Sequence, residues 1–212
     1  MIYLSPSRIA IGVVGLLIAT WFVWPGDRTY PITNATPTAG TQIIAFGDSL
    51  TEGVGSLANG YVEQLASRLN ITIINKGVRG DTTAAALQRL DRDVLDQDPR
   101  IVLVGLGGND MLRRVPIDEA FANLEQIVTR IQDRGALVII LALDGVLMVG
   151  GGFEERYRDL AERLGCPIVP DLLGDVIGQR KLMADSVHPN QAGYSVIVDK
   201  IVPVLEAYIA GH

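Results

Sequence analysis

Histidine is nearly absent from this chain, which has two in 212 residues. His212 is the last residue, where chains are usually frayed, so His188 is the only imidazole placed to act as a base. A histidine-rich metal site is therefore excluded, and no Cys/His spacing indicates zinc.

Cysteine and tryptophan are also scarce, and acidic residues outnumber basic ones by 24 to 18. Cys166 is the single cysteine, so no internal disulfide forms, and its apolar neighbours indicate a small buried side chain rather than a reactive thiol. The net charge of −6 argues against a nucleic-acid partner. No tryptophan follows Trp24, and sugar-binding sites commonly use aromatic stacking platforms, so a polysaccharide substrate is disfavoured.

The N-terminus holds the longest uncharged apolar run, Ile9–Trp24, preceded by Arg8. Sixteen residues are few for a membrane span and many for a soluble core helix. We favour an uncleaved anchor over residues 1–26, because bulky Trp21–Trp24 stands where a signal peptidase needs small residues. A cleaved signal and a buried helix remain alternatives.

Arg8 places the short N-terminal end in the cytoplasm. The rest of the chain would then be anchored to the inner membrane facing the periplasm or cell exterior, or be secreted or periplasmic if the signal is cleaved. Residues 27–40, rich in Pro, Thr and Ala, are interpreted as a linker, and residues 41–212 as one domain. We expect a monomer.

Strand-like and helix-like patterns alternate through this domain. Strands are predicted over 42–46, 71–74, 101–106, 136–143 and 168–169, and helices over 61–69, from 81 or 82 to 95, 117–133, 153–164 and 191–209. This alternation predicts an α/β fold with a doubly wound, flavodoxin-like parallel sheet of five strands. The expected strand order is 2-1-3-4-5, with helices on both faces.

Polar residues follow three of these strands, at the sheet edge where α/β proteins bind ligands. Ser49 comes directly after the first strand and is either a helix N-cap or a nucleophile. As a nucleophile it needs a base, which His188 supplies, and Asp185 can hold the other ring nitrogen of that histidine. The backbone N–H of Gly80 and the amide of Asn109 can donate to a developing oxyanion.

Four sequence blocks occur in order: Gly-Asp-Ser-Leu at 47–50, Arg-Gly-Asp-Thr at 79–82, Gly-Gly-Asn-Asp at 107–110 and Asp-x-x-His-Pro-Asn at 185–190. With them the chain, from about residue 41 to 210, resembles the SGNH (GDSL) hydrolases. The closest resemblance is to the bacterial thioesterase I, lysophospholipase L1 and arylesterase branch, in which a serine stands where this chain has Arg79.

The resemblance implies that Ser49 is the nucleophile, His188 the base and Asp185 its orienting partner. It also implies an oxyanion hole formed by Ser49, Gly80 and Asn109. Asp48 and Asp110 are interpreted as bracing their loops through backbone hydrogen bonds. The implied reaction is acyl transfer through an acyl-serine intermediate, with no metal and no organic cofactor.

Apolar residues near these blocks are candidates for an acyl groove: Met111, Leu112, Leu147, Met148 and Met183. They favour a medium or long acyl chain released from a lysophospholipid, an acyl thioester or an aryl ester. Two alternatives remain open. One is a deacetylase of O-acetylated polysaccharide with the same machinery, and the other is a non-catalytic, membrane-tethered binding module.

Overall fold

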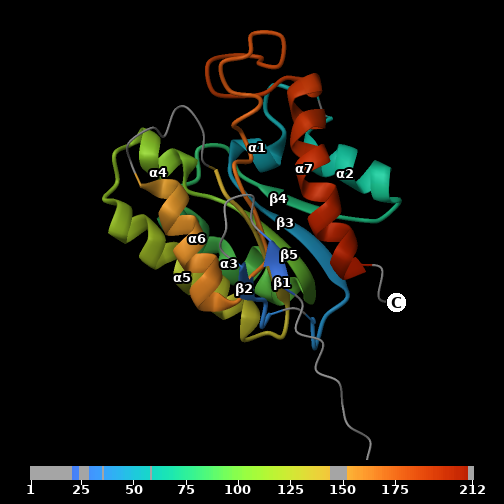
Figure 1. Cartoon of the computed structure of the whole chain (residues 1–212), viewed down its shortest axis with the longest axis vertical. Coiled ribbons are helices and arrows are strands. Elements are labelled where there is room, and N and C mark those ends of the chain that lie inside the picture. The colour runs from blue at the N-terminus through green and yellow to red at the C-terminus, as the bar shows by residue number, and fades with distance from the viewer. Residues whose placement is uncertain (1–20, 24–28, 35, 58, 144–151, 210–212) are drawn as a thin grey trace, which may run out of the picture.

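The computed structural model describes residues 21–23, 29–34, 36–57, 59–143 and 152–209. Its main sheet has five parallel strands: β3 (Gln42–Gly47), β4 (Ile74–Gly77), β5 (Pro99–Gly105), β6 (Leu137–Leu141) and β7 (Ile168–Val169). The spatial order is β4-β3-β5-β6-β7, of which β4, β3 and β5 are labelled in Figure 1. Counted from β3, this is the expected order 2-1-3-4-5, so the predicted doubly wound fold is confirmed.

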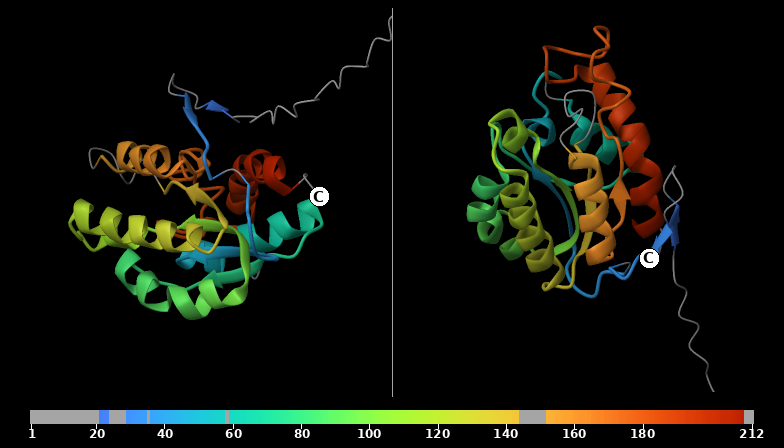
Figure 2. Two further views of the ribbon diagram at one scale, coloured as in Figure 1. Left: turned by 90° about the horizontal axis from the view of Figure 1, so that it is seen from below. Right: turned by 60° about the vertical axis from the view of Figure 1, so that its left-hand side comes forward.

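Helices cover both faces of the sheet (Figure 2). On one side, α2 (Tyr61–Leu69) packs against α7 (Gln191–Ile209). A second group consists of α3 (Thr83–Asp93), α5 (Ile117–Gln132) and α6 (Phe153–Leu164), in which α5 contacts both of the others. Every residue of the interior strand β6 is apolar and buried, as expected for a strand covered on both faces.

The second strand of the sheet begins three residues later than the sequence pattern predicts. The apolar run 71–74 was expected to form it, but β4 spans Ile74–Gly77, paired with β3 from Ile44 to Gly47. Asn70 ends α2 in the left-handed conformation, and the N–H of Ile71 bonds back to the carbonyl of Ala66. Ile71 is therefore used in ending the helix, and pairing with β3 starts at Ile74.

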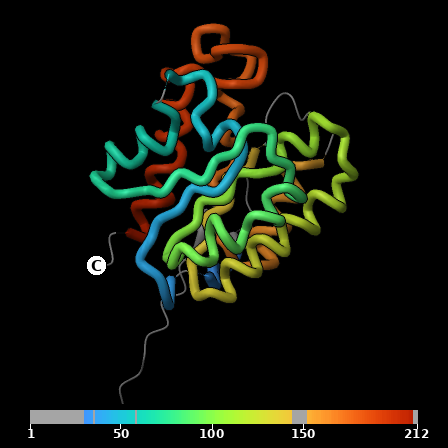
Figure 3. Tube along the Cα trace, turned by 180° about the vertical axis from the view of Figure 1, so that it is seen from behind, coloured from blue at the N-terminus to red at the C-terminus, as the bar shows by residue number. Residues whose placement is uncertain are grey.

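Two short helices lie where only loops were expected. They are α1 (Ser49–Glu52), directly after β3, and α4 (Gly108–Leu112), after β5. A short 3-10 turn at Leu95–Gln97 follows α3. The long loop between β7 and α7 rises above the same edge of the sheet (Figure 3). The two short helices and the loop between β7 and α7 therefore surround the carboxyl edge of the sheet.

Part of the segment interpreted as a linker packs against the domain. Strand β2 (Thr29–Pro31) pairs antiparallel with β1 (Trp21–Val23). The hydroxyl of buried Tyr30 donates to the carbonyl of Cys166 at 2.7 Å, and Ile32 is also buried. The Asn34 amide bonds the backbone on either side of Leu137. Tyr30 and Ile32 belong to the core, and the partners of Tyr30 and Asn34 lie near the amino ends of β6 and β7, at the edge of the sheet opposite α1.

The predicted anchor, residues 1–26, lies outside the described residues except for Trp21–Val23 in β1. Within the described ranges, no helix is both long and apolar enough to cross a membrane. Cys166 is buried, as expected, and burial raises the pKa of its thiol to about 12.

Candidate active site

Ser49 is the first residue of α1, at the carboxyl end of β3. The cap of this helix is Asp48, whose Oδ1 accepts the N–H of Leu50 at 3.0 Å. Ser49 is therefore not the N-cap, and its hydroxyl makes a different contact. Its Oγ lies 3.0 Å from Nε2 of His188, although 139 residues separate the two in the chain.

The loop before α7 holds His188 in place. Its Nδ1 lies 2.7 Å from Oδ2 of Asp185, while Oδ1 of Asp185 accepts the N–H groups of Val187 and His188 at 2.8 Å each. Hydrogen bonds from the Val187 N–H and the histidine ring lower the pKa of Asp185 to about 2. Asp185 is thus a carboxylate at neutral pH, fixed to its own loop, and faces one nitrogen of the imidazole while Ser49 faces the other.

A glycine lets the segment after α1 approach this loop closely. Gly55 has φ +93°, and a Cβ there would lie 2.9 Å from Cβ of Ala184 and 3.4 Å from Cβ of His188. The hydroxyl of Tyr194, in α7, donates to the carbonyl of Val54 at 2.8 Å. The segment that follows Ser49 therefore packs directly against the loop of His188 and the start of α7.

Gly80 lies in a tight turn between β4 and α3. The turn is closed by the N–H of Asp81, which bonds the carbonyl of Val78 at 3.1 Å. Gly80 is the third of its four residues and has φ +79°, the conformation that a type II turn requires at that position. Gly80 and the side chain of Asn109 border the same cavity as Ser49 and His188.

Two buried aspartates connect these segments, with contacts that reach beyond the loops they were predicted to brace. Oδ2 of Asp48 accepts the amide N–H of Asn109 at 3.1 Å, and burial raises the pKa of this carboxyl group to about 6. Asp110 is fully buried and accepts both the backbone N–H and the hydroxyl of Thr83, at 2.8 and 2.7 Å. α4 is therefore tied to the nucleophile segment on one side and to the start of α3 on the other.

A cavity of about 170 Å³ opens beside Ser49. Its wall is mostly apolar, with Met111, Leu112, Leu143, Leu173, Ile177 and Val187 among the residues that form it. Of the five acyl-groove candidates, Met111 and Leu112 lie here, whereas Leu147 and Met148 fall outside the described residues.

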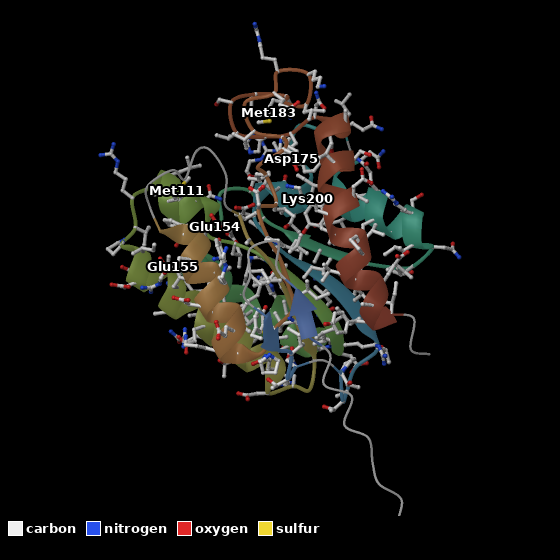
Figure 4. All side chains as sticks on the ribbon, in the orientation of Figure 1. Met111, Glu154, Glu155, Asp175, Met183 and Lys200 are labelled. Atoms are coloured by element: carbon white, nitrogen blue, oxygen red, sulfur yellow. The ribbon has the colours of Figure 1, made fainter. Side chains whose placement is uncertain are left out.

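The fifth candidate, Met183, does not border this cavity. It forms an isolated antiparallel bridge with Pro189 and packs partly against the core. Figure 4 shows it in the loop between β7 and α7, away from Met111 on α4. Leu143 and Leu173 were missed, although they follow the carboxyl ends of β6 and β7, the positions where ligands bind in such sheets.

Sequence reasoning also missed a largely buried arginine next to the site. Arg89 of α3 bonds Asp81 at 2.5 Å, Asp93 at 3.0 Å and the carbonyl of Gly47 at 2.9 Å. Its guanidinium lies 4.4 Å from the ring centroid of Phe46. It thereby joins the residue before Asp48 to the residue after Gly80. Its i,i+4 spacing from Asp93 within α3 was the available signal.

No group of three or more His, Cys, Asp or Glu side chains within the described ranges is arranged to hold a metal ion.

Comparison with known proteins places this geometry in one family. Residues 45–196 match the model of the GDSL-like Lipase/Acylhydrolase family. Esterase TesA of Pseudomonas aeruginosa is 28% identical over 179 residues, covering 79% of this chain and 89% of the relative. The acetylxylan esterase of Geobacillus stearothermophilus is 31% identical over 208 residues, covering 82% and 90%.

Solved structures agree with these sequence matches. The crystal structure of TesA superposes with a TM-score of 0.74 at 28% identity, covering 78% of this chain and 98% of TesA. The SGNH-hydrolase family esterase AlinE4 gives 0.64 at 35% identity, covering 78% and 95%. A serine beside a histidine and an aspartate, on this fold and with these relatives, is the arrangement of a carboxylic ester hydrolase. The chain therefore belongs to the GDSL-like lipase/acylhydrolase family of serine esterases.

Proposed function

We propose that Ser49, His188 and Asp185 act as a catalytic triad in ester hydrolysis. Nε2 of His188 takes the proton of Ser49 as Oγ attacks the ester carbonyl carbon, and returns it to the leaving group as the ester bond breaks. Water, activated by the same nitrogen, then hydrolyses the acyl-serine. The contacts of 3.0 and 2.7 Å that join the three side chains in series are the observation that carries this proposal.

The oxyanion formed in both steps is stabilised by the N–H groups of Ser49 and Gly80 and by the amide of Asn109. A donor that acts only on the transition state is worth about 3 kcal/mol. Asn109→Ala is therefore expected to lower kcat by about 10²-fold while KM changes little. The reverse pattern, an unchanged kcat with a raised KM, would make Asn109 a substrate-binding residue instead.

The apolar wall beside Ser49 supports an acyl ester as the substrate. Met111 and Leu112 come from one side and Leu173 and Ile177 from the other. The cavity of about 170 Å³ is smaller than most small-molecule pockets, which start at about 300 Å³. We therefore infer an acyl chain of short to medium length, shorter than the sequence alone suggested. Aryl esters, thioesters and lysophospholipids of that length are the candidate substrates.

The acyl preference is tested with p-nitrophenyl esters from acetate to palmitate. We expect kcat/KM to peak between acetate and octanoate and to fall for longer chains. Leu173→Trp narrows the cavity and should move the peak toward acetate, whereas Leu57→Trp, at a fully exposed position away from the cavity, should not. A peak at palmitate, or no effect of Leu173→Trp, would contradict the inferred groove.

Removal of acetyl groups from polysaccharide is the second candidate. It is favoured by the 31% identity with the acetylxylan esterase over 90% of that protein. The two functions share the chemistry and differ in the alcohol that leaves. Acetylated xylan and p-nitrophenyl butyrate separate them: a kcat/KM higher by tenfold or more on the polysaccharide would replace the first proposal with the second.

For the N-terminal segment we propose export, with residues 1–26 as a membrane anchor or signal. The apolar run Ile9–Trp24 and the charge of Arg8 support this. Fractionation of cells expressing the full chain tests it. Recovery in the membrane fraction, accessible to protease from outside, indicates an anchor; recovery of a shortened chain in the periplasm indicates cleavage; and recovery of the full chain in the cytoplasm would refute export.

A further inference from the structure

The turn that carries Gly80 is held at both ends by charged side chains from the two neighbouring site helices. Oε2 of Glu52, the last residue of α1, accepts the backbone N–H of Arg79 at 2.7 Å. Nη2 of Arg113, the C-cap of α4, donates to the carbonyl of Gly80 at 2.7 Å. We propose that Glu52 and Arg113 are positioning residues that aim the Gly80 N–H at the oxyanion.

Each of these helices also carries another proposed oxyanion donor. α1 begins with Ser49, and α4 carries Asn109, whose carbonyl accepts the backbone N–H of Arg113 at 3.0 Å. Glu52 thus connects the turn to the helix of the first donor, and Arg113 connects it to the helix of the third. The three donors lie on segments far apart in the chain, and these two side chains set their relative positions.

The geometry of the turn explains why two restraints are needed. The donor N–H belongs to the peptide between Arg79 and Gly80, the central peptide of the turn. Type I and type II turns differ by a rotation of this peptide of about 180°, which points its N–H to opposite sides. Glycine at the third position of the turn can adopt either form, and here its φ of +79° is that of type II. The hydrogen bonds of Glu52 and Arg113 hold the peptides on either side, and both are charge-assisted.

The close packing of the turn supports this role. A Cβ on Gly77, two residues before Arg79, would collide with the backbone N of Glu52, and a Cβ on Gly80 would lie 3.3 Å from Nη2 of Arg113. Arg79 also pairs with Glu52 through its side chain, at 3.4 Å, but that contact is exposed and long. The backbone contacts are the shorter ones and carry the inference.

The test compares removal of each contact with its conservative replacement, in the full chain. Glu52→Ala and Arg113→Ala are each expected to lower kcat for p-nitrophenyl acetate about tenfold, with KM within about twofold and an unchanged urea midpoint. Glu52→Gln keeps an acceptor oxygen and Arg113→Lys keeps a donor, so both should recover most of kcat. Arg114→Ala removes the same charge from the same loop and should leave kcat unchanged.

The double variant Glu52→Ala/Arg113→Ala gives a further test. Because both residues act on one donor, their combined effect on kcat should not exceed the loss of that donor, about 10²- to 10³-fold. An unchanged kcat in the alanine variants, a raised KM at constant kcat, or no recovery in Glu52→Gln and Arg113→Lys would each overturn the inference.

The inference rests on the proposed esterase function, and the two can fail separately. If the wild-type chain does not hydrolyse p-nitrophenyl acetate, the proposed function fails. If it does and the variants match it, only the positioning role fails. The neutral substrate excludes a simple attraction between Arg113 and an anionic ester as the cause of an effect.

Discussion

Asp48→Asn tests whether one buried carboxylate both orients Asn109 and destabilises the fold. Asp48 is 2% exposed, accepts the Leu50 N–H through Oδ1 and accepts the Asn109 amide through Oδ2. Asparagine can repeat the first contact but presents an NH₂ group to Asn109. Asn109 must then turn its oxygen toward residue 48, so it no longer donates to the cavity. We expect kcat to fall about 10²-fold, as for a lost oxyanion donor.

Although Asp48→Asn should lower kcat, it should raise the stability of the fold at neutral pH relative to the native chain. Burial raises the pKa of Asp48 from 3.8 to about 6, so the folded state binds this proton more tightly than the unfolded state. The native chain therefore loses stability as pH rises from about 4 through 6. A shift of about two pKa units corresponds to about 3 kcal/mol. Asp48→Asn has no proton to lose over this range. Between pH 4 and pH 8, the unfolding free energy of the variant, relative to that of the native chain, should therefore rise by about this amount.

Urea unfolding of both proteins at pH 4 and pH 8 measures this difference. The contributions of Asp93 and Asp185, whose pKa values are lowered to about 2 by their hydrogen-bond partners, are common to both proteins and cancel. A relative gain near 3 kcal/mol together with a loss of kcat would support the reasoning. A gain below about 1 kcal/mol, or a variant that keeps full activity, would refute it.

Three further changes probe other parts of the structure. Asp185→Asn should lower kcat by about 10⁴-fold, less than Ser49→Ala, and equal losses would show that Asp185 does more than orient His188. Arg89→Met leaves the buried carboxylate of Asp81 without its partner and should cost about 3–5 kcal/mol of unfolding free energy, whereas Arg130→Ala, from an exposed ion pair, should cost under about 1. A chain starting at residue 40 lacks buried Tyr30 and Ile32 and should melt below one starting at residue 29; equal melting temperatures would contradict their role in the core.

The position of the candidate site was predictable because most of its proposed catalytic residues lie in short blocks at strand ends. Sheet order follows from the alternation of elements, so the blocks around Ser49, Gly80 and Asn109 could be placed at one edge from the order of the strands alone. His188 had no competitor except the last residue. These arguments need only which strand precedes which loop, and that information is local in the sequence.

What escaped prediction depends on contacts between distant residues. The cavity residues Leu173 and Ile177 lie in a loop whose path no periodicity reveals, and Met183, which lies in the same loop, does not border the cavity. Tyr30 and Asn34 looked like linker residues because their partners, near Cys166 and Leu137, are more than 100 residues away. Side chains that meet backbone groups so far along the chain leave no local pattern.

The most direct test is to trap the covalent intermediate on Ser49. The native chain, Ser49→Ala and His188→Ala are incubated with a fluorophosphonate and with p-nitrophenyl acetate, and the adduct is located by peptide mass spectrometry. We predict one adduct on the peptide that contains Ser49, a slow reaction in His188→Ala and none in Ser49→Ala. Labelling that persists in Ser49→Ala, or hydrolysis by the native chain without any adduct at Ser49, would contradict acyl transfer through this serine.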